Sequence, residues 1–184
     1  MKGIVFNLLE SFICEYWGQD TYEEVLGQCP LKTKEPFIGP GTYPDTDLIL
    51  LAEKTADKLG VSLADALRDF GRFCFPHMIR KIKNLEVEQM SAKEFLLIVN
   101  DLVHLEVKKF YQNADVPHFI YHDNKNDELL IEYHSKRQLC AFMEGLLDGV
   151  AEEFNTPMRF HQTQCVHVGH DHCLFNISFG ERHD

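Results

Sequence analysis

The chain has 184 residues, of which 45% are hydrophobic and 14 are phenylalanine. This is too much apolar side chain for a disordered protein and too little length for two ordinary domains. We therefore expect residues 1–184 to form a single domain. A net charge of -11 disfavours binding to nucleic-acid backbones and to anionic membrane surfaces. The apolar N-terminal stretch is interrupted by Asn7, Glu10 and Glu15, so the sequence predicts neither a membrane span nor a secretory signal there. We therefore expect a cytoplasmic protein.

The first part of the chain has the pattern of a helical protein. Apolar residues at helical spacing predict a helix over 4–16, and Asp20 with Glu23 resembles the capping box of a second, short helix. A loop rich in proline and glycine follows over 30–44. Three further helices are predicted. One runs from Asp45 to Gly60, and the next begins at Ser62 and is ended or kinked by Pro76. A capping box of Ser91 and Glu94 begins a long third helix that reaches Phe110.

From residue 117 the pattern changes to short strands. Two hairpins are predicted, with strands over 117–122, 128–133, 158–168 and 173–179. An amphipathic helix is expected between the hairpins, over 139–154. The sequence therefore predicts an α+β fold, in which an N-terminal helical subdomain is followed by a small antiparallel sheet with one inserted helix.

His104 lies between Val103 and Leu105 near the middle of the long predicted helix. A neutral imidazole in such a place is either a hydrogen-bonded core residue or a ligand of haem iron. Because single core histidines are common, this residue taken alone favours the structural interpretation.

Tyr133, Ser135 and Arg137 alternate at the end of a predicted strand, which would place their side chains on one side of the backbone. A phenol, a hydroxyl and a guanidinium offer several hydrogen-bond donors and no fixed negative charge. Such a set suits two neighbouring carboxylates of one ligand, and haem propionates are such a pair. The structural alternative is a tyrosine in a cross-strand pair, a surface arginine and a serine that caps the following helix.

Together these features resemble the haem nitric oxide/oxygen binding family, which includes bacterial gas sensors and the haem domain of soluble guanylate cyclase. The resemblance spans nearly the whole chain and rests on the opening MKGIVFN, the segment DLVHLEV around His104, Pro117, and the triplet of Tyr133, Ser135 and Arg137. It implies that haem b is buried between the helices and the sheet, with His104 as the axial iron ligand and the triplet at the propionates. It also implies a pocket lined by Val5, Phe75, Met78, Pro117, Phe142 and Leu146, although ordinary core packing would explain Phe75, Met78, Phe142 and Leu146 equally well.

The resemblance implies a gas sensor rather than an enzyme. Oxygen-binding members carry a distal tyrosine where this chain has Phe142, which offers bound O₂ no hydrogen-bond donor, and Cys74 is only a weak substitute. We therefore expect binding of NO and CO but no stable O₂ complex. By the resemblance, NO weakens or breaks the bond between iron and His104, and a separate histidine kinase or cyclic-dinucleotide enzyme reads the resulting movement.

A second metal site is predicted from Cys140, His161, Cys165 and Cys173. His161 and Cys165 are four residues apart on one predicted strand and would share a face, and Cys173 would return beside Cys165 on the partner strand. Four such ligands suit structural Zn²⁺, and certain bacterial members of the family look similar here. Oxidation of the thiolates would give this site a redox input.

Alternatives stay open for both sites. The three cysteines could be reduced thiols that hold no metal, and His167, His170 or His172 could replace His161 as a ligand. Cys14 and Cys29 have no evident partner. At the level of function, the two competing hypotheses are a thiol and zinc redox module without haem, and a haem peroxidase. The sequence disfavours the peroxidase because the expected distal side has no evident pair of histidine and arginine.

Overall fold

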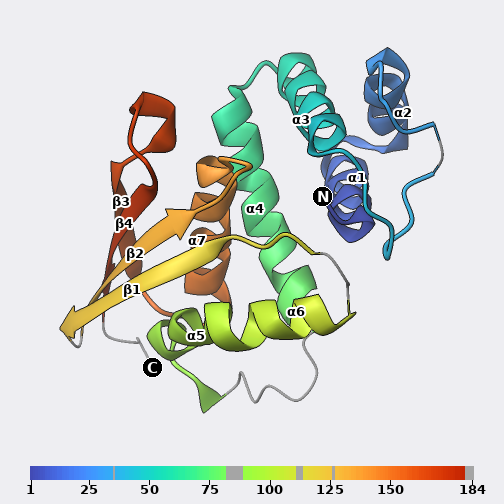
Figure 1. The fold of residues 1–184 in the computed structure, drawn as a ribbon. Helices are drawn as coiled ribbons and strands as arrows, with labels where there is room; N and C mark the ends of the chain where they lie inside the picture. The colour runs from blue at the N-terminus through green and yellow to red at the C-terminus, as the bar shows by residue number, and fades with distance from the viewer. Residues whose placement is uncertain (35, 82–88, 111–113, 126, 181–184) are drawn as a thin grey trace.

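The computed structural model describes residues 1–34, 36–81, 89–110, 114–125 and 127–180. Helices form the first part of the chain and a sheet the last, which confirms the predicted α+β class (Figure 1). The helices are α1 (Gly3–Trp17), α2 (Gln19–Gln28), α3 (Asp45–Leu59), α4 (Leu63–Ile79), α5 (Ala92–Ile98), α6 (His104–Phe110) and α7 (Cys140–Glu153). The strands are β1 (His118–Lys125), β2 (Glu128–His134), β3 (Met158–Gln164) and β4 (Cys173–Phe179). None of the described helices is long and apolar enough to cross a bilayer.

Local chemistry explains several helix boundaries that the sequence predicted. The Ser62 hydroxyl caps α4 by accepting a hydrogen bond from the backbone N–H of Asp65 at 3.0 Å. Ser91 and Glu94 form the expected capping box at the start of α5. Gly60 ends α3 with φ at 69°, in the left-handed region that glycine adopts without strain.

The start of α2 and the end of α4 differ from the expectation. Gly18, with φ at 87°, connects α1 directly to α2, and no side chain caps the second helix. Glu23 instead accepts a hydrogen bond from the side chain of Gln19 at 2.8 Å, so the capping box expected of Asp20 and Glu23 does not form. The helix α4 continues past Pro76, which therefore does not end it.

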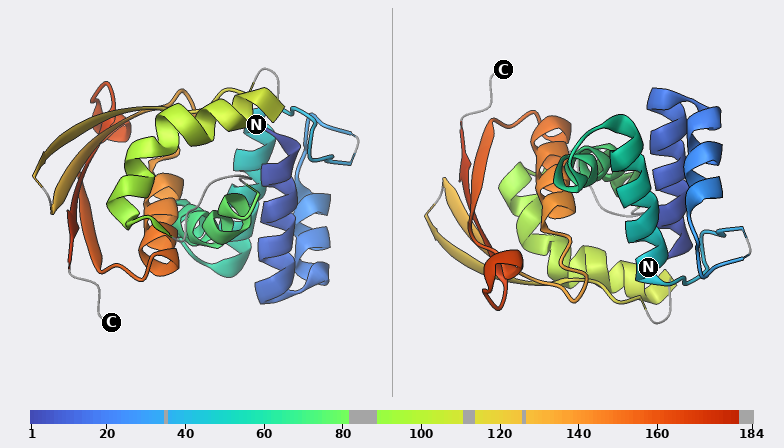
Figure 2. Two further views of the ribbon diagram at one scale, coloured as in Figure 1. Left: turned by 90° about the horizontal axis from the view of Figure 1, so that it is seen from below. Right: turned by 90° about the horizontal axis from the view of Figure 1, so that it is seen from above.

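The long helix predicted through His104 is interrupted. After α5, a π-helical turn, η2 (Val99–Val103), precedes α6, which begins at His104. Such turns are rare and often mark functional sites. Within η2, the side chain of Asn100 accepts a hydrogen bond from the backbone N–H of Phe119 at 3.3 Å, which ties the turn to β1. Both views in Figure 2 show α5 and α6 running from beside the sheet toward the N-terminal helices.

The four strands form an antiparallel sheet in the order β1-β2-β4-β3. One face packs on α5 and α7 in a core that includes Ile131, Phe175 and Leu147. The strand expected over 158–168 ends early, because β3 stops at Gln164 and a short 3₁₀ turn, η3 (Val166–Val168), follows. The pairing of β3 with β4 also has an irregularity between Gln162 and Gln164, which matters for the cysteines described below.

The helices α4 and α7 are in backbone contact, and this contact joins the helical part of the chain to the sheet. A Cβ atom at Gly145 would lie 1.9 Å from the carbonyl oxygen of Arg68, and one at Gly71 would lie 2.2 Å from that of Phe142. Only glycine allows so close an approach. The Arg68 guanidinium adds two hydrogen bonds to Asp148, at 2.7 and 3.1 Å.

A buried carboxylate fixes the loop over 30–44. Asp47 on α3 is 2% exposed and accepts hydrogen bonds from the backbone N–H groups of Lys32 at 3.0 Å and Thr33 at 2.9 Å, and from the Thr33 hydroxyl at 2.6 Å. Burial alone would raise the pKa of Asp47, but these hydrogen bonds lower it below its ordinary value.

We expect Asp47→Asn to lower the free energy of unfolding by about 1–3 kcal/mol at pH 7, because three donors lose a charged acceptor. Since the folded-state pKa of Asp47 is depressed, its contribution is present above the unfolded pKa of about 3.9 and is lost as the pH falls below it. Urea unfolding between pH 7 and pH 3 should therefore show the two proteins converging in acid. The control, Asp57→Asn on the exposed side of the same helix, should change stability by no more than about 0.5 kcal/mol. Equal effects of the two substitutions would contradict the assignment.

Candidate functional site

A cavity of about 1140 Å³ opens between the helices and the sheet. This volume is somewhat larger than the usual range of ligand and cofactor pockets, roughly 300–1000 Å³. Its walls come from the N-terminal residues, the end of the 30–44 loop, α4, α5, α6, α7, β1 and β2. All ten residues that the sequence associated with haem line this one cavity: Val5, Phe75, Met78, His104, Pro117, Tyr133, Ser135, Arg137, Phe142 and Leu146.

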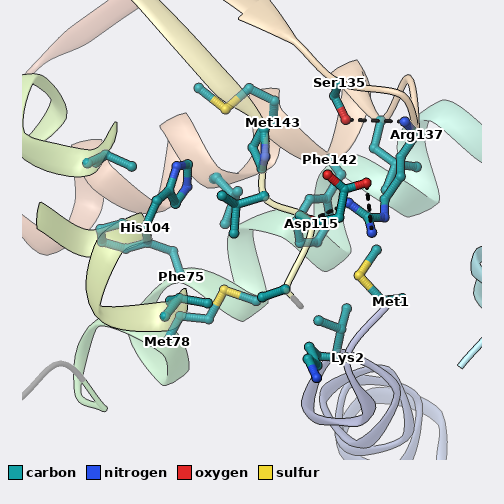
Figure 3. Close-up of a pocket in the computed structure, with 18 of the residues that line it drawn as sticks. Met1, Lys2, Phe75, Met78, His104, Asp115, Ser135, Arg137, Phe142 and Met143 are labelled. Atoms are coloured by element: carbon teal, nitrogen blue, oxygen red, sulfur yellow. Dashed lines mark hydrogen bonds and ion pairs between the residues drawn. The ribbon is translucent and has the colours of Figure 1, made fainter. Parts of the chain in front are cut away.

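His104 stands at one end of the cavity (Figure 3). Its ring stacks on that of Phe119, with centroids 5.4 Å apart and an angle of 26° between the planes. No described group makes a hydrogen bond of normal geometry to its buried Nδ1 atom. Burial lowers the pKa of His104 to about 4, and the charges of Lys108 and His118 lower it further. The imidazole is therefore neutral near pH 7, which is the form that ligates metals.

Arg137 and Ser135 lie at the opposite end of the cavity from His104 (Figure 3). The Arg137 guanidinium is 13% exposed and contacts two acidic residues: its Nε atom is 3.0 Å from a carboxylate oxygen of Asp45, and it donates a 2.5 Å hydrogen bond to the backbone carbonyl of Asp115. The Ser135 hydroxyl accepts a 3.3 Å hydrogen bond from the backbone N–H of Arg137. Beside them, burial raises the pKa of Tyr133 to about 12, so its phenol stays protonated and can donate.

The chemistry of these donors fits haem. A macrocycle with an apolar body needs apolar walls, an iron ligand and a counter-charge for two carboxylates, and the cavity offers all three in His104, its hydrophobic lining and Arg137. The carboxylates of such a ligand would compete with Asp45 and Asp115 for the guanidinium. Sequence reasoning missed these two aspartates, because each meets Arg137 only through the tertiary fold and neither lies in a recognisable motif.

The wall around Phe142 is apolar. The Phe142 ring packs on that of Phe70 at 5.3 Å between centroids. Tyr43 also lines the cavity, but its hydroxyl is used elsewhere: it accepts a hydrogen bond from the backbone N–H of Ile38 at 2.8 Å and donates one to the backbone carbonyl of Pro36 at 3.2 Å. Cys74, the weak donor considered above, is buried in the core of the N-terminal helices and is not among the described residues that line the cavity.

Comparison with known proteins agrees with the fold and the cavity. A model of the family described as haem-NO-binding matches residues 2–162. The chain therefore belongs to this family, whose domains bind haem and act as gas sensors rather than as enzymes. The expectation of a sensor rather than an enzyme agrees with this family.

Solved H-NOX structures share the whole fold. One from S. oneidensis in the Fe(II)NO ligation state is 28% identical, covers 98% of this chain and 100% of its own, and has a TM-score of 0.91. One from Shewanella woodyi, bound to IWP-051 in the Fe(II)CO state, is 28% identical, covers 100% of this chain and 97% of its own, and has a TM-score of 0.84. One from K. algicida, unliganded, is 23% identical, covers 98% and 97%, and supports the fold alone with a TM-score of 0.89. The search of curated proteins gave no match.

Three of the four predicted zinc ligands meet. The sulfur atoms of Cys140, Cys165 and Cys173 all lie within 4.8 Å of one another, and those of Cys140 and Cys165 are 3.7 Å apart. Burial is the main cause that raises the pKa of Cys140, and electrostatic repulsion from Cys173 is the second. For Cys165 burial would do the same, but hydrogen bonds from the backbone N–H of His167 and from the side chains of Cys140 and Gln162 lower its pKa.

His161 does not join these thiols, and the prediction that it shares a face with Cys165 is wrong. His161 is exposed and pairs with Asn176, on the face of the sheet opposite the buried Cys173. The irregularity between Gln162 and Gln164 shifts the alternation of β3 by one residue. Gln162 rather than His161 therefore contacts Cys165.

Proposed function

We propose that residues 1–184 form one cytoplasmic domain that binds haem b and senses nitric oxide, with His104 as the axial iron ligand and Tyr133, Ser135 and Arg137 at the propionates. The observation that carries this proposal is the arrangement of a single cavity: a neutral imidazole whose Nδ1 atom is buried lies at one end, a guanidinium that is 13% exposed lies at the other, and the walls between them are apolar. When bound, haem supplies a ferrous iron that takes diatomic gases as ligands. The apolar walls exclude water from it, and their members in this proposal are Val5, Phe75, Met78, Pro117, Phe142 and Leu146.

The position of His104 in its helix supports a mechanism for signalling. His104 is the first residue of α6 and directly follows the η2 turn, where the helical hydrogen bonding already changes. His104 would hold the iron and haem would supply the binding site for NO; if NO weakened or broke the hold of His104 on the iron, α6 would be free to move relative to α5 at this turn. Phe119, stacked on the imidazole and bonded to Asn100, would carry that movement to β1. The ligand then sets the balance of two packings through its different affinity for each.

A separate protein reads this balance in our proposal, either a histidine kinase or a cyclic-dinucleotide enzyme. The net charge of -11 favours a basic docking surface on that partner, since complementary charge speeds and orients association.

We expect His104→Gly to reduce the haem content of the purified chain by about tenfold, because the iron loses its protein ligand. Added imidazole should restore binding by occupying the vacated space, and the restored protein should again change its absorption spectrum with NO. The control, His77→Gly, removes an imidazole of α4 that packs on Phe73 and does not line the cavity. Haem content at the wild-type level in His104→Gly without imidazole would contradict the proposal.

The apolar surroundings of Phe142 support selectivity for NO and CO over O₂. Bound O₂ acquires negative charge and needs a hydrogen-bond donor, which phenylalanine lacks. Of the three tyrosines that line the cavity in the described part of the chain, Tyr43 is bonded within its loop and Tyr133 belongs to the triplet. Tyr121 has a buried hydroxyl, but its ring packs on Phe119, the ring that stacks on His104, and so lies on the His104 side of the cavity. We therefore propose that the chain forms no stable O₂ complex.

Phe142→Tyr should raise the O₂ affinity of the reduced protein by about tenfold to hundredfold, the value of one hydrogen bond to a charged acceptor. Absorption spectra recorded in air report the change. Phe142→Leu, which alters the same wall without adding a hydroxyl, should show no gain. Wild-type protein that binds O₂ stably in air would overturn the selectivity.

We also propose that Cys140, Cys165 and Cys173 hold Zn²⁺ as thiolates. The supporting observations are the three converging sulfurs and the backbone N–H groups of Val166 and His167 directed at Cys173 and Cys165. Zinc here would tie the start of α7 to the start of β4. Oxidation of two thiols to a disulfide by a peroxide, with release of zinc and reduction of the peroxide, would add the redox input.

Cys165→Ser should therefore lower the zinc content per chain, measured by elemental analysis, whereas His161→Gln should leave it unchanged because His161 lies on the opposite face. Equal loss of zinc in both variants would restore His161 as a ligand. Zinc at the wild-type level in Cys165→Ser would rule the thiol site out.

A further inference from the structure

The outer face of the sheet carries imidazoles grouped around one carboxylate, away from both sites described above. One oxygen of Glu132 is 2.7 Å from Nε2 of His122. The other is 3.0 Å from Nε2 of His134 and 3.8 Å from Nε2 of His172. One ligand atom each from Glu132, His134 and His172 lies within 4.8 Å of the other two.

Strand register builds this group. Glu132 and His134 alternate with the buried Ile131 and Tyr133, so both point outward from β2. Because Tyr133 pairs with Cys173 on β4, the preceding His172 comes to lie beside His134. The rings of His134 and His172 stack with centroids 4.8 Å apart and an angle of 28°.

The separations between the Glu132 oxygen and the two imidazole nitrogens suit one small cation. Ligand atoms bound about 2.1 Å from a common ion lie at most about 4.2 Å from one another. The distances of 3.0 and 3.8 Å between the Glu132 oxygen and the two imidazoles fall within this limit. The side chains are 20% exposed at Glu132 and 23% at His172, which leaves them partly fixed by their neighbours and still open to solvent.

The ligand types decide the class of ion. The Nε2 atoms of His122, His134 and His172 all face Glu132, so imidazole nitrogens gather around one carboxylate. Imidazole nitrogens with a carboxylate suit zinc, nickel and copper, and poorly suit magnesium or calcium. The net charge of -11 raises the local concentration of any cation.

We propose that Glu132, His134 and His172 bind one divalent transition-metal ion, with His122 orienting the carboxylate of Glu132. Water completes the coordination. The ion links β2 to the start of β4 on the outer face, whereas the thiols of Cys140, Cys165 and Cys173 lie together on the inner side. This site does not depend on haem binding or on gas sensing.

The test titrates Ni²⁺ into the chelator-treated full chain by calorimetry. Glu132→Gln and His134→Gln should each bind one equivalent of Ni²⁺ fewer than the wild type, and His122→Gln should bind it about tenfold more weakly. His170→Gln is the matched control, because His170 is exposed in the turn before β4 and is outside the group. Its stoichiometry and affinity should equal those of the wild type.

Paramagnetic broadening locates the ion. In the reduced protein kept under CO, Ni²⁺ should broaden backbone amide resonances around residues 132–134 and 172 in the wild type and not in Glu132→Gln. Circular dichroism checks that each variant is folded. Wild-type stoichiometry in both Glu132→Gln and His134→Gln, or broadening confined to the surroundings of the three cysteines, would overturn the proposal.

Discussion

The neutral state of one buried imidazole is the constraint on which the site depends. His104 is stacked on Phe119 inside an apolar cavity, and burial holds its pKa to about 4. A protonated ring in that place would be a charge held in apolar surroundings and would have no lone pair to offer a metal. The surrounding fold therefore has two tasks: it must keep water from the imidazole, and it must leave room for an apolar ligand beside it.

Glycine contacts between α4 and α7 allow both tasks. Because Gly71 and Gly145 bring the two backbones together, the rings of Phe75 and Phe142 project from adjacent helices into the same cavity. A larger residue at either glycine would push the helices apart, since packed interiors absorb extra atoms only by displacement. The contact therefore sets the width of the wall opposite the sheet, and with it the space that remains for the ligand.

Sequence patterns predict what depends on neighbours along the chain. Capping by Ser62 and Ser91 and the alternation of the residues before Arg137 are local, and the structure has them. The wrong prediction for His161 has a different origin. One irregularity in the pairing of β3 reverses which of the following residues face inward, and no residue type near Gln162 indicates it. Likewise the π turn before His104 replaces an ordinary helical pattern, and Asp45 and Asp115 reach Arg137 only after the chain has folded. Irregular backbone and contacts between distant segments are therefore the parts that the sequence leaves open.

The strand pair β2 and β4 shows how one register serves several chemistries at once. Tyr133 faces the cavity and pairs with Cys173, which faces the other thiols, while Glu132 and His134 turn outward beside His172. Each of these residues changes face if the register slips by one position. A slip would therefore turn the Tyr133 phenol out of the cavity and, at the same time, bury the Glu132 carboxylate. The cost of burying Glu132 and exposing Tyr133 acts against such a slip. Polar residues on the outer face therefore help to specify the pairing that places the inner ones, whether or not a metal ion is bound.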